Sequence, residues 1–145
     1  MKFEKSLGYV FLQTSNNYRN ALEKTMNEID LHYGQIAVLS MLWDKDARSQ
    51  IALAKGLKVS QVTINKMVKS LAQKNFVSCR QCENDGRKMR VYLTVKGRET
   101  EQRVVEKTNL LQTEFFLSLT ETEQLIFKQL CDKLGESNSR SKSGE

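Results

Sequence analysis

Residues 60–71 sort into two faces if the segment is helical. Its apolar positions, three or four residues apart, are Ile64, Met67, Val68 and Leu71. The opposite stripe consists of Gln61, Val62, Asn65, Lys66 and Lys69. Side-chain amides can pair with the edge of adenine in the major groove, so Gln61 and Asn65 are predicted to contact bases. The side chains predicted to hold phosphates are Ser60, Thr63, Lys66 and Lys69.

A second basic group follows a turn signal further along the chain. Residues 83–88 separate two alternating segments and predict a β-hairpin. Its tip carries Arg87 and Lys88, with Arg90 close behind. Any exposed hairpin tip is polar, but three bases within four residues favour a contact with DNA. We expect Arg87 to lie in or over the minor groove, with Asp85 orienting it or a neighbouring arginine.

Charge is distributed unevenly along the chain. The whole chain carries a net charge of +6, yet residues 47–98 hold twelve Lys or Arg and two Asp or Glu, which is +10. Residues 47–82 contain no acid at all. A lysine-rich surface kept for solubility is the alternative, but solubility does not require acids to be excluded from 36 successive residues. The distribution predicts a surface for a polyanion, most simply a nucleic acid.

Residue types suited to catalysis or metal binding are scarce. The single histidine and the lack of a phosphate-binding glycine loop predict neither an enzyme nor a cofactor or metal site. The odd set of cysteines (Cys79, Cys82 and Cys131) suits a reducing compartment. No apolar run approaches the ~20 residues that span a bilayer, and the N-terminus lacks a signal-peptide pattern. A cytoplasmic protein without a membrane partner is therefore expected.

The elements around the polar stripe follow the order of a winged helix. Ser49 is predicted to cap a short helix that ends at Gly56 with a positive φ. Ser60 is predicted to cap the next helix, which ends at Asn75 in the left-handed conformation. A hairpin over residues 76–94 closes the unit. The stripe therefore belongs to the second helix of a helix-turn-helix.

Long amphipathic segments flank this unit on both sides. Residues 3–29 predict one helix. Residues 95–134 predict two helices, which begin after caps at Thr94 and Thr120 and end before Gly135. They have more apolar positions than one small core needs, so we expect them to pair with a second copy of the chain. Residues 137–145 contain no apolar side chain and predict a disordered tail. The expected organisation is one domain over residues 1–136, with its helix-turn-helix part at about 35–97.

A set of short motifs lies in order within a region of about residues 31–120. The most specific is Asp85-Gly86-Arg87-Lys88, followed by Leu93-Thr94-Val95-Lys96-Gly97. The others are Gln35-Ile36-Ala37-Val38-Leu39, Ser49-Gln50-Ile51-Ala52-Leu53-Ala54 and Val59-Ser60-Gln61-Val62-Thr63-Ile64. Taken together, the chain resembles the MarR/SlyA family of bacterial transcription regulators. Lys66 stands where that family usually has arginine, which replaces a bidentate reader of guanine with a point charge.

This resemblance implies a mainly α fold with a small β-hairpin: a winged helix-turn-helix with N- and C-terminal dimerisation helices. It implies a homodimer that binds a palindromic operator as a repressor or an anti-silencing activator. It also implies a small aromatic or anionic effector between the dimerisation helices and the DNA-binding part. By position, the residues expected at the effector are Tyr9, Gln13, Tyr18, His32, Tyr33 and Trp43. Core packing is the alternative for the aromatic residues, and helix capping is the alternative for His32.

Two other functions remain open from the sequence. Oxidation of Cys79 or Cys82 would make the protein a redox-responsive regulator, although the two side chains are expected on opposite faces of one strand. A winged helix used for protein interaction would require an apolar outer face on the helix from Ser60. The lysines on that face argue against it.

Overall fold

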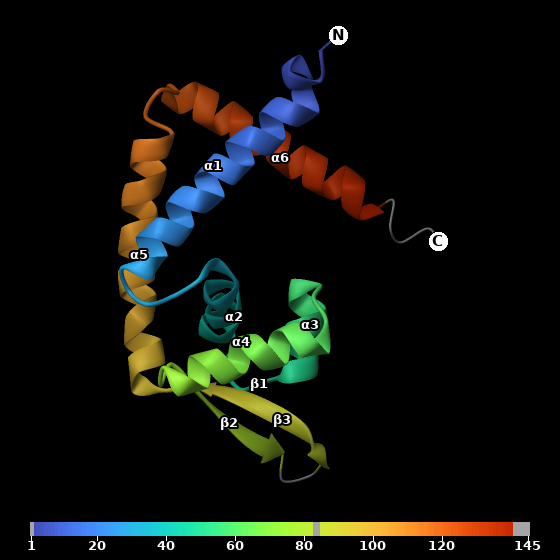
Figure 1. Cartoon of the computed structure of the whole chain (residues 1–145), viewed down its shortest axis with the longest axis vertical. Coiled ribbons are helices and arrows are strands. Elements are labelled where there is room, and N and C mark those ends of the chain that lie inside the picture. The colour runs from blue at the N-terminus through green and yellow to red at the C-terminus, as the bar shows by residue number, and fades with distance from the viewer. Residues whose placement is uncertain (1, 83–84, 141–145) are drawn as a thin grey trace. The chain divides into compact units, whose positions relative to one another are not determined.

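The computed structural model describes residues 2–82 and 85–140, with the backbone alone at Cys82, residues 85–88 and Arg140. The chain divides into two compact units, Met1–Asn109 and Leu110–Glu145. The order of elements is η1 (Phe3–Lys5), α1 (Leu7–Asn27), α2 (Tyr33–Asp44), β1 (Arg48–Ser49), α3 (Gln50–Leu57), α4 (Gln61–Gln73), β2 (Val77–Cys82), β3 (Asp85–Leu93), α5 (Val95–Phe115) and α6 (Glu121–Arg140) (Figure 1). Of the described helices, none is long and apolar enough to cross a membrane.

The first unit has one core, which lies between α2, α3, α4 and the sheet. Its fully buried side chains include Val38, Leu39 and Leu42 of α2 and Leu53 of α3. The α4 side chains Ile64, Val68 and Leu71 complete this core. The predicted inward face of α4 is therefore confirmed, with Met67 half-buried at its margin.

The sheet is antiparallel, with strand order β1-β3-β2. The sequence predicts the β2–β3 hairpin but misses β1, whose two residues pair with Val91 and Arg90. Asp46 supports this corner, because its Oδ1 atom accepts hydrogen bonds from the backbone N–H groups of Leu93 (2.9 Å) and Ala47 (2.8 Å). The strand β1 thus connects the base of the β2–β3 hairpin to the start of α3.

Side-chain caps begin the helices where the sequence predicts them. Ser49 Oγ accepts from the N–H of Ala52 at 3.1 Å, and Ser60 Oγ accepts from the N–H of Thr63 at 3.1 Å. Thr94 Oγ1 accepts from the N–H of Gly97, and Thr120 forms a capping box with Glu123. These bonds satisfy N–H groups that have no partner inside their own helix.

Gly56 does not end the helix it belongs to, which corrects the prediction. The helix α3 continues to Leu57, and Lys58 takes the left-handed conformation with φ of 55°. A Cβ atom on Gly56 would overlap the terminal methyl group of Met41. Gly56 therefore lies where α3 packs on α2, and a larger residue there would require the flexible Met41 side chain to move. The second predicted left-handed position, Asn75, is confirmed with φ of 64°.

The terminal helices also differ from their predicted limits. Residues 3–29 do not form one helix, because Ser6 is extended (ψ 149°) and caps α1 after the short turn η1. The last helix, α6, passes through Gly135 and reaches Arg140, so residues 137–140 are helical rather than part of a disordered tail. Residues 141–145 lie outside the described residues.

The second unit consists of the end of α5, a turn and α6. The aromatic rings of Phe115, Phe116 and Phe127 contact one another, with centroids 5.1 and 5.9 Å apart. Every α6 side chain from Glu121 to Leu130 is exposed, including apolar ones. The exposed large apolar residues of α6 are Leu125, Ile126, Phe127, Leu130 and Leu134.

Candidate nucleic-acid interface

The outer stripe of α4 is fully presented to solvent. All five of its predicted members are exposed: Gln61, Val62, Asn65, Lys66 and Lys69. Because the opposite face packs into the core, these side chains are held on a packed helix rather than on a loop. The structure thus brings together two amides, an aliphatic side chain and two ammonium groups on one helical surface.

The start of α4 is stabilised by its own hydroxyl groups. Ser60 Oγ lies 2.9 Å from Thr63 Oγ1 and also accepts from the backbone N–H of Thr63. Both hydroxyl groups predicted to hold phosphates are thus already engaged in the cap. The first N–H groups of a helix point outward and attract anions, so the backbone there can supply a contact that the hydroxyls do not.

The lysines around this surface carry charge that no described carboxylate neutralises. Among the side chains that the structure describes, those of residues 2–81 and 89–139, no Asp or Glu oxygen lies within 4.0 Å of the ammonium groups of Lys66 and Lys69. The same holds for Lys55 in the last turn of α3 and for Lys58 just after it, both of which are exposed. The site prediction omits these last two, although they belong to the acid-free segment that signals the surface.

One of the bases predicted at the tip of the β2–β3 hairpin, Arg90, does not extend freely into solvent. Side chains of Asp85, Arg87 and Lys88 lie outside the described residues. Arg90 is half-buried, and its Nη1 atom donates to the carbonyl oxygen of Ala47 at 2.7 Å. This bond ties β3 to the segment before β1, so Arg90 holds the sheet together rather than extending freely from the tip.

Arg80 is a surface base that the site prediction misses. It is exposed on β2, directly across from Arg90 in the antiparallel register. Its guanidinium lies over the ring of Tyr92, 5.0 Å from the centroid. Stacking on an aromatic ring orients the guanidinium without an acidic partner. The signal that could have identified Arg80 is the presence of an aromatic residue, Tyr92, on the neighbouring strand of the predicted hairpin.

The residues predicted at an effector do not gather in one place. Gln13 donates to the Tyr9 hydroxyl near the start of α1. Tyr33 lies ten residues before Trp43 on α2, which is about 15 Å along a helix. Trp43 Nε1 donates to the carbonyl oxygen of Gly97 at 2.9 Å and so anchors α2 to the start of α5. The Trp43 side chain is thus half-buried and engaged in a contact between two helices.

A polar cluster does form where α1 meets α2. Glu23 Oε1 accepts from the backbone N–H of Tyr33 at 2.9 Å, and Glu23 Oε2 lies 3.6 Å from His32 Nδ1. Arg19 lies over the Tyr33 ring, 5.5 Å from the centroid. His32 is the N-cap residue of α2, and its backbone N–H donates to Gln35 Oε1. Of the predicted effector residues, His32 and Tyr33 are brought together, while Tyr18 is half-buried further along α1.

Gln35 connects this junction to α4. It is a buried polar residue, and its Nε2 atom donates to Ser70 Oγ at 2.7 Å. Lys74, at the end of α4, donates to the carbonyl oxygen of Asp30 at 2.9 Å. Two hydrogen bonds therefore link the segment before α2 and its first turn to the helix that carries the outer stripe. Sequence periodicity gives no signal for this link.

Cys79 is poorly suited to oxidation sensing. Burial raises the pKa of the Cys79 thiol above its ordinary value, although a hydrogen bond with Gln50 acts in the opposite direction. A raised pKa lowers the thiolate fraction, and the thiolate is the form that reacts with peroxide. The side chain of Cys82 lies outside the described residues. Among the described His, Cys, Asp and Glu residues, no three are grouped to hold a metal ion.

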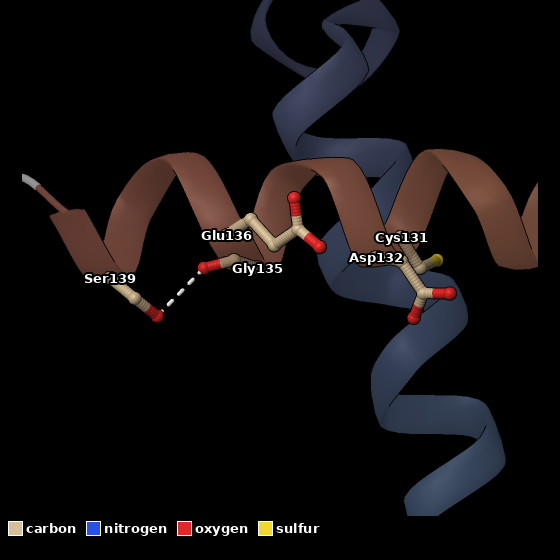
Figure 2. A pocket seen from close by; sticks show the side chains of 5 residues that line it. All are labelled: Cys131, Asp132, Gly135, Glu136 and Ser139. Carbon is tan, nitrogen blue, oxygen red and sulfur yellow. Dashed lines mark hydrogen bonds between the residues drawn. The ribbon is translucent and has the colours of Figure 1, made fainter.

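A shallow hollow lies on α6 beside Cys131. Figure 2 shows its lining, which comes from one helix: Cys131, Asp132, Gly135, Glu136 and Ser139. The Ser139 hydroxyl donates back to the carbonyl oxygen of Gly135 at 2.8 Å. The surface therefore combines a half-buried thiol with two carboxylates, a set that does not favour binding of DNA.

Comparison with known proteins agrees with this geometry. Residues 20–104 match the family model of the transcriptional regulators SarA/Rot. The transcriptional repressor YetL of Bacillus subtilis is 36% identical over 87 residues. The matched part is 53% of this chain and 52% of YetL, about half the length of each.

Solved structures identify the fold. A crystal structure of MarR superposes with a TM-score of 0.85 at 20% identity and covers 100% of this chain and 99% of that chain. BpsR of Bordetella bronchiseptica, whose DNA binding is regulated by 6-hydroxynicotinic acid, gives a TM-score of 0.81 at 21% identity. That match covers 93% of this chain and 96% of BpsR. The predicted mainly α winged helix-turn-helix fold is thereby confirmed.

Proposed function

Since the chain belongs to the SarA/Rot family of transcriptional regulators, we propose that it controls transcription by binding a palindromic DNA site as a homodimer. In this proposal α4 enters the major groove, and the β2–β3 hairpin lies along the neighbouring backbone or minor groove. The observation that carries it is the exposed α4 stripe, which combines base-reading amides with unneutralised lysines. A helix of this kind, packed on its inner face and polar on its outer face, is how helix-turn-helix proteins read DNA.

Within the stripe, different side chains have different roles. Gln61 and Asn65 contact base edges, because an amide can both donate to and accept from adenine. Lys66 and Lys69 contact phosphates, with the α4 N-terminus and the exposed Lys55 and Lys58 adding to the same field. Arg87 and Lys88 extend the contact from the hairpin, with Asp85 orienting a guanidinium.

The homodimer is proposed from large apolar side chains that are exposed on α1 and α6. On α1 they are Leu7, Val10, Phe11 and Leu12, and on α6 they include Leu125, Leu130 and Leu134. Exposed apolar surface of this extent marks an interaction site. Pairing through these helices would present two α4 helices to half-sites about 34–36 Å apart, one turn of DNA.

A repressor role is favoured over activation by the similarity to YetL, which is named a repressor. A protein that occupies a promoter site blocks polymerase without needing a further activity. Ligand control is proposed at the α1–α2 junction, where Arg19 offers a guanidinium group, His32 an imidazole and Tyr33 a ring to an aromatic acid. Regulation of BpsR by 6-hydroxynicotinic acid supports this class of ligand. The ligand must prefer one arrangement of the protein to change its DNA affinity.

Selection of bound sequences from random duplex DNA tests the function. The wild-type protein is expected to enrich one palindromic motif. Gln61→Ala and Asn65→Ala are expected to change the preferred bases within each half-site. Gln102→Ala, an exposed glutamine on α5, is the matched control and is expected to leave the motif unchanged. Enrichment of no motif by the wild-type protein would contradict the proposal.

A panel of aromatic acids, added to the same binding reaction, tests the ligand site. An active compound is expected to act on the wild type and to lose its effect in Tyr33→Ala. If every compound that shifts DNA affinity acts equally on Tyr33→Ala, the junction is not the ligand site. The DNA-binding proposal would survive that result.

A further inference from the structure

Val62 is an aliphatic residue at the centre of an otherwise polar surface. It is the second residue of α4, and its side chain is 62% exposed. Its neighbours on the outer stripe are two amides and two lysines, whereas the apolar residues of the opposite face are buried or half-buried. A single exposed aliphatic residue is ordinary on a protein surface. Its position in the first turn of this particular helix gives it a specific meaning.

The first turn of a recognition helix is the part that approaches base edges most closely. Val62 has no hydrogen-bonding atom in its side chain, so it cannot read a donor or an acceptor there. The one apolar feature of the major groove is the C5-methyl group of thymine. A β-branched side chain is also stiff at χ1, so it loses little rotamer freedom on contact.

We propose that Val62 is a specificity-determining residue that contacts the C5-methyl group of one thymine in each half-site. This inference rests on the proposed function, because it assumes that α4 enters the major groove. It adds the chemical feature that is read, a methyl group, and the residue that reads it. At this position cytosine is disfavoured because it presents an amino group and no methyl group to the valine.

Deoxyuridine provides a direct test, because it differs from thymidine only in lacking the methyl group. Each thymine of the selected site is replaced in turn, symmetrically in both half-sites, and the equilibrium affinity of the full-length protein is measured. For the wild type, one position is expected to lose about four-fold per half-site, the effect of burying one methyl group. The remaining thymine positions are expected to show no comparable loss.

The Val62→Ala variant then connects that position to the residue. It is expected to bind the thymine site more weakly than the wild type and to bind the deoxyuridine site with the same affinity as the thymine site. Val95→Ala is the matched control, since Val95 is also in the first turn of a helix and is 70% exposed. It lies beyond the far end of α4 and is expected to keep the wild-type preference. Thermal unfolding checks that both variants remain folded.

The outcomes separate this inference from the proposed function. Selective binding by the wild type with no loss at any deoxyuridine would overturn the role of Val62 and leave the proposed function intact. Retention of the full thymine preference by Val62→Ala would do the same. Failure of the wild type to select any DNA sequence would overturn both.

Discussion

Gly97 shows how a single residue sets the distance between the hairpin and α5. A Cβ atom there would overlap the carbonyl oxygen of Phe76, a backbone atom that cannot move alone. Gly97→Ala is therefore expected to lower the free energy of unfolding by about 2–4 kcal/mol. Gly135→Ala is the control, because no atom lies within 4 Å of its added Cβ and alanine favours a helix by about 0.5–1 kcal/mol. Urea unfolding measures both, and equal effects would contradict the packing argument.

Cys79 is the residue on which the redox alternative depends. Its pKa is raised by burial, so at a given pH the folded protein has less thiolate than the unfolded chain. In a Cys82→Ser, Cys131→Ser variant, alkylation at pH 8 is expected to be slower for the folded protein than for the same protein in urea. The folded rate should rise with pH beyond the point where the unfolded rate has levelled off. Loss of DNA binding in dilute peroxide that disappears in Cys79→Ser would contradict this view and restore the redox function.

At the scale of elements, a substitution at Ser60 distinguishes helix capping from contact with DNA. Aspartate caps a helix as well as serine does, but it adds a negative charge beside the proposed phosphate position. Ser60→Asp is expected to keep the unfolding free energy within about 0.5 kcal/mol of wild type and to weaken DNA binding at least ten-fold. Thr120→Asp, at the cap of α6, is the control and should leave DNA binding unchanged. Equal DNA affinity of Ser60→Asp and wild type would place the α4 N-terminus away from DNA.

Much of the arrangement of elements could be predicted because its signals are local. Serine and threonine caps precede apolar periodicity at Ser49, Ser60 and Thr120, and the structure has the expected bonds at all three. The two faces of α4 follow from a period of 3.6 residues and are confirmed by burial. Local sequence signals therefore predict both where these helices begin and which face of α4 is exposed.

The features that sequence reasoning misses depend on tertiary contacts. Gly56 resembles a helix end, but it lies inside α3, at a contact with the Met41 side chain of α2. The strand β1 has only two residues, too few for an alternating pattern, and it exists because β3 is available to pair with it. Arg90 resembles a free base until its bond with Ala47 is seen. The predicted effector residues are dispersed because their spacing in sequence does not specify which of them point toward each other.

At the scale of the whole molecule, the exposed apolar faces predict a homodimer. Sedimentation should give a mass of twice the 16.7 kDa of the chain at micromolar concentration. Phe11→Glu places a charge among exposed apolar side chains of α1 and is expected to raise the dimer dissociation constant at least ten-fold. Asn17→Glu introduces the same charge at an exposed polar position of the same helix and should have little effect. A monomeric wild type would contradict the dimer and the palindromic site together.

The central claim is that the outer face of α4 binds the DNA backbone and bases. The most direct measurement is the salt dependence of DNA affinity for Lys66→Ala and Lys69→Ala, compared with Lys133→Ala on α6. Each α4 variant is expected to bind more weakly across sequences and to reduce the slope of log affinity against log salt by about one per subunit. Lys133→Ala should retain the wild-type slope. Slopes that are identical for all four proteins would contradict the placement of α4 on DNA.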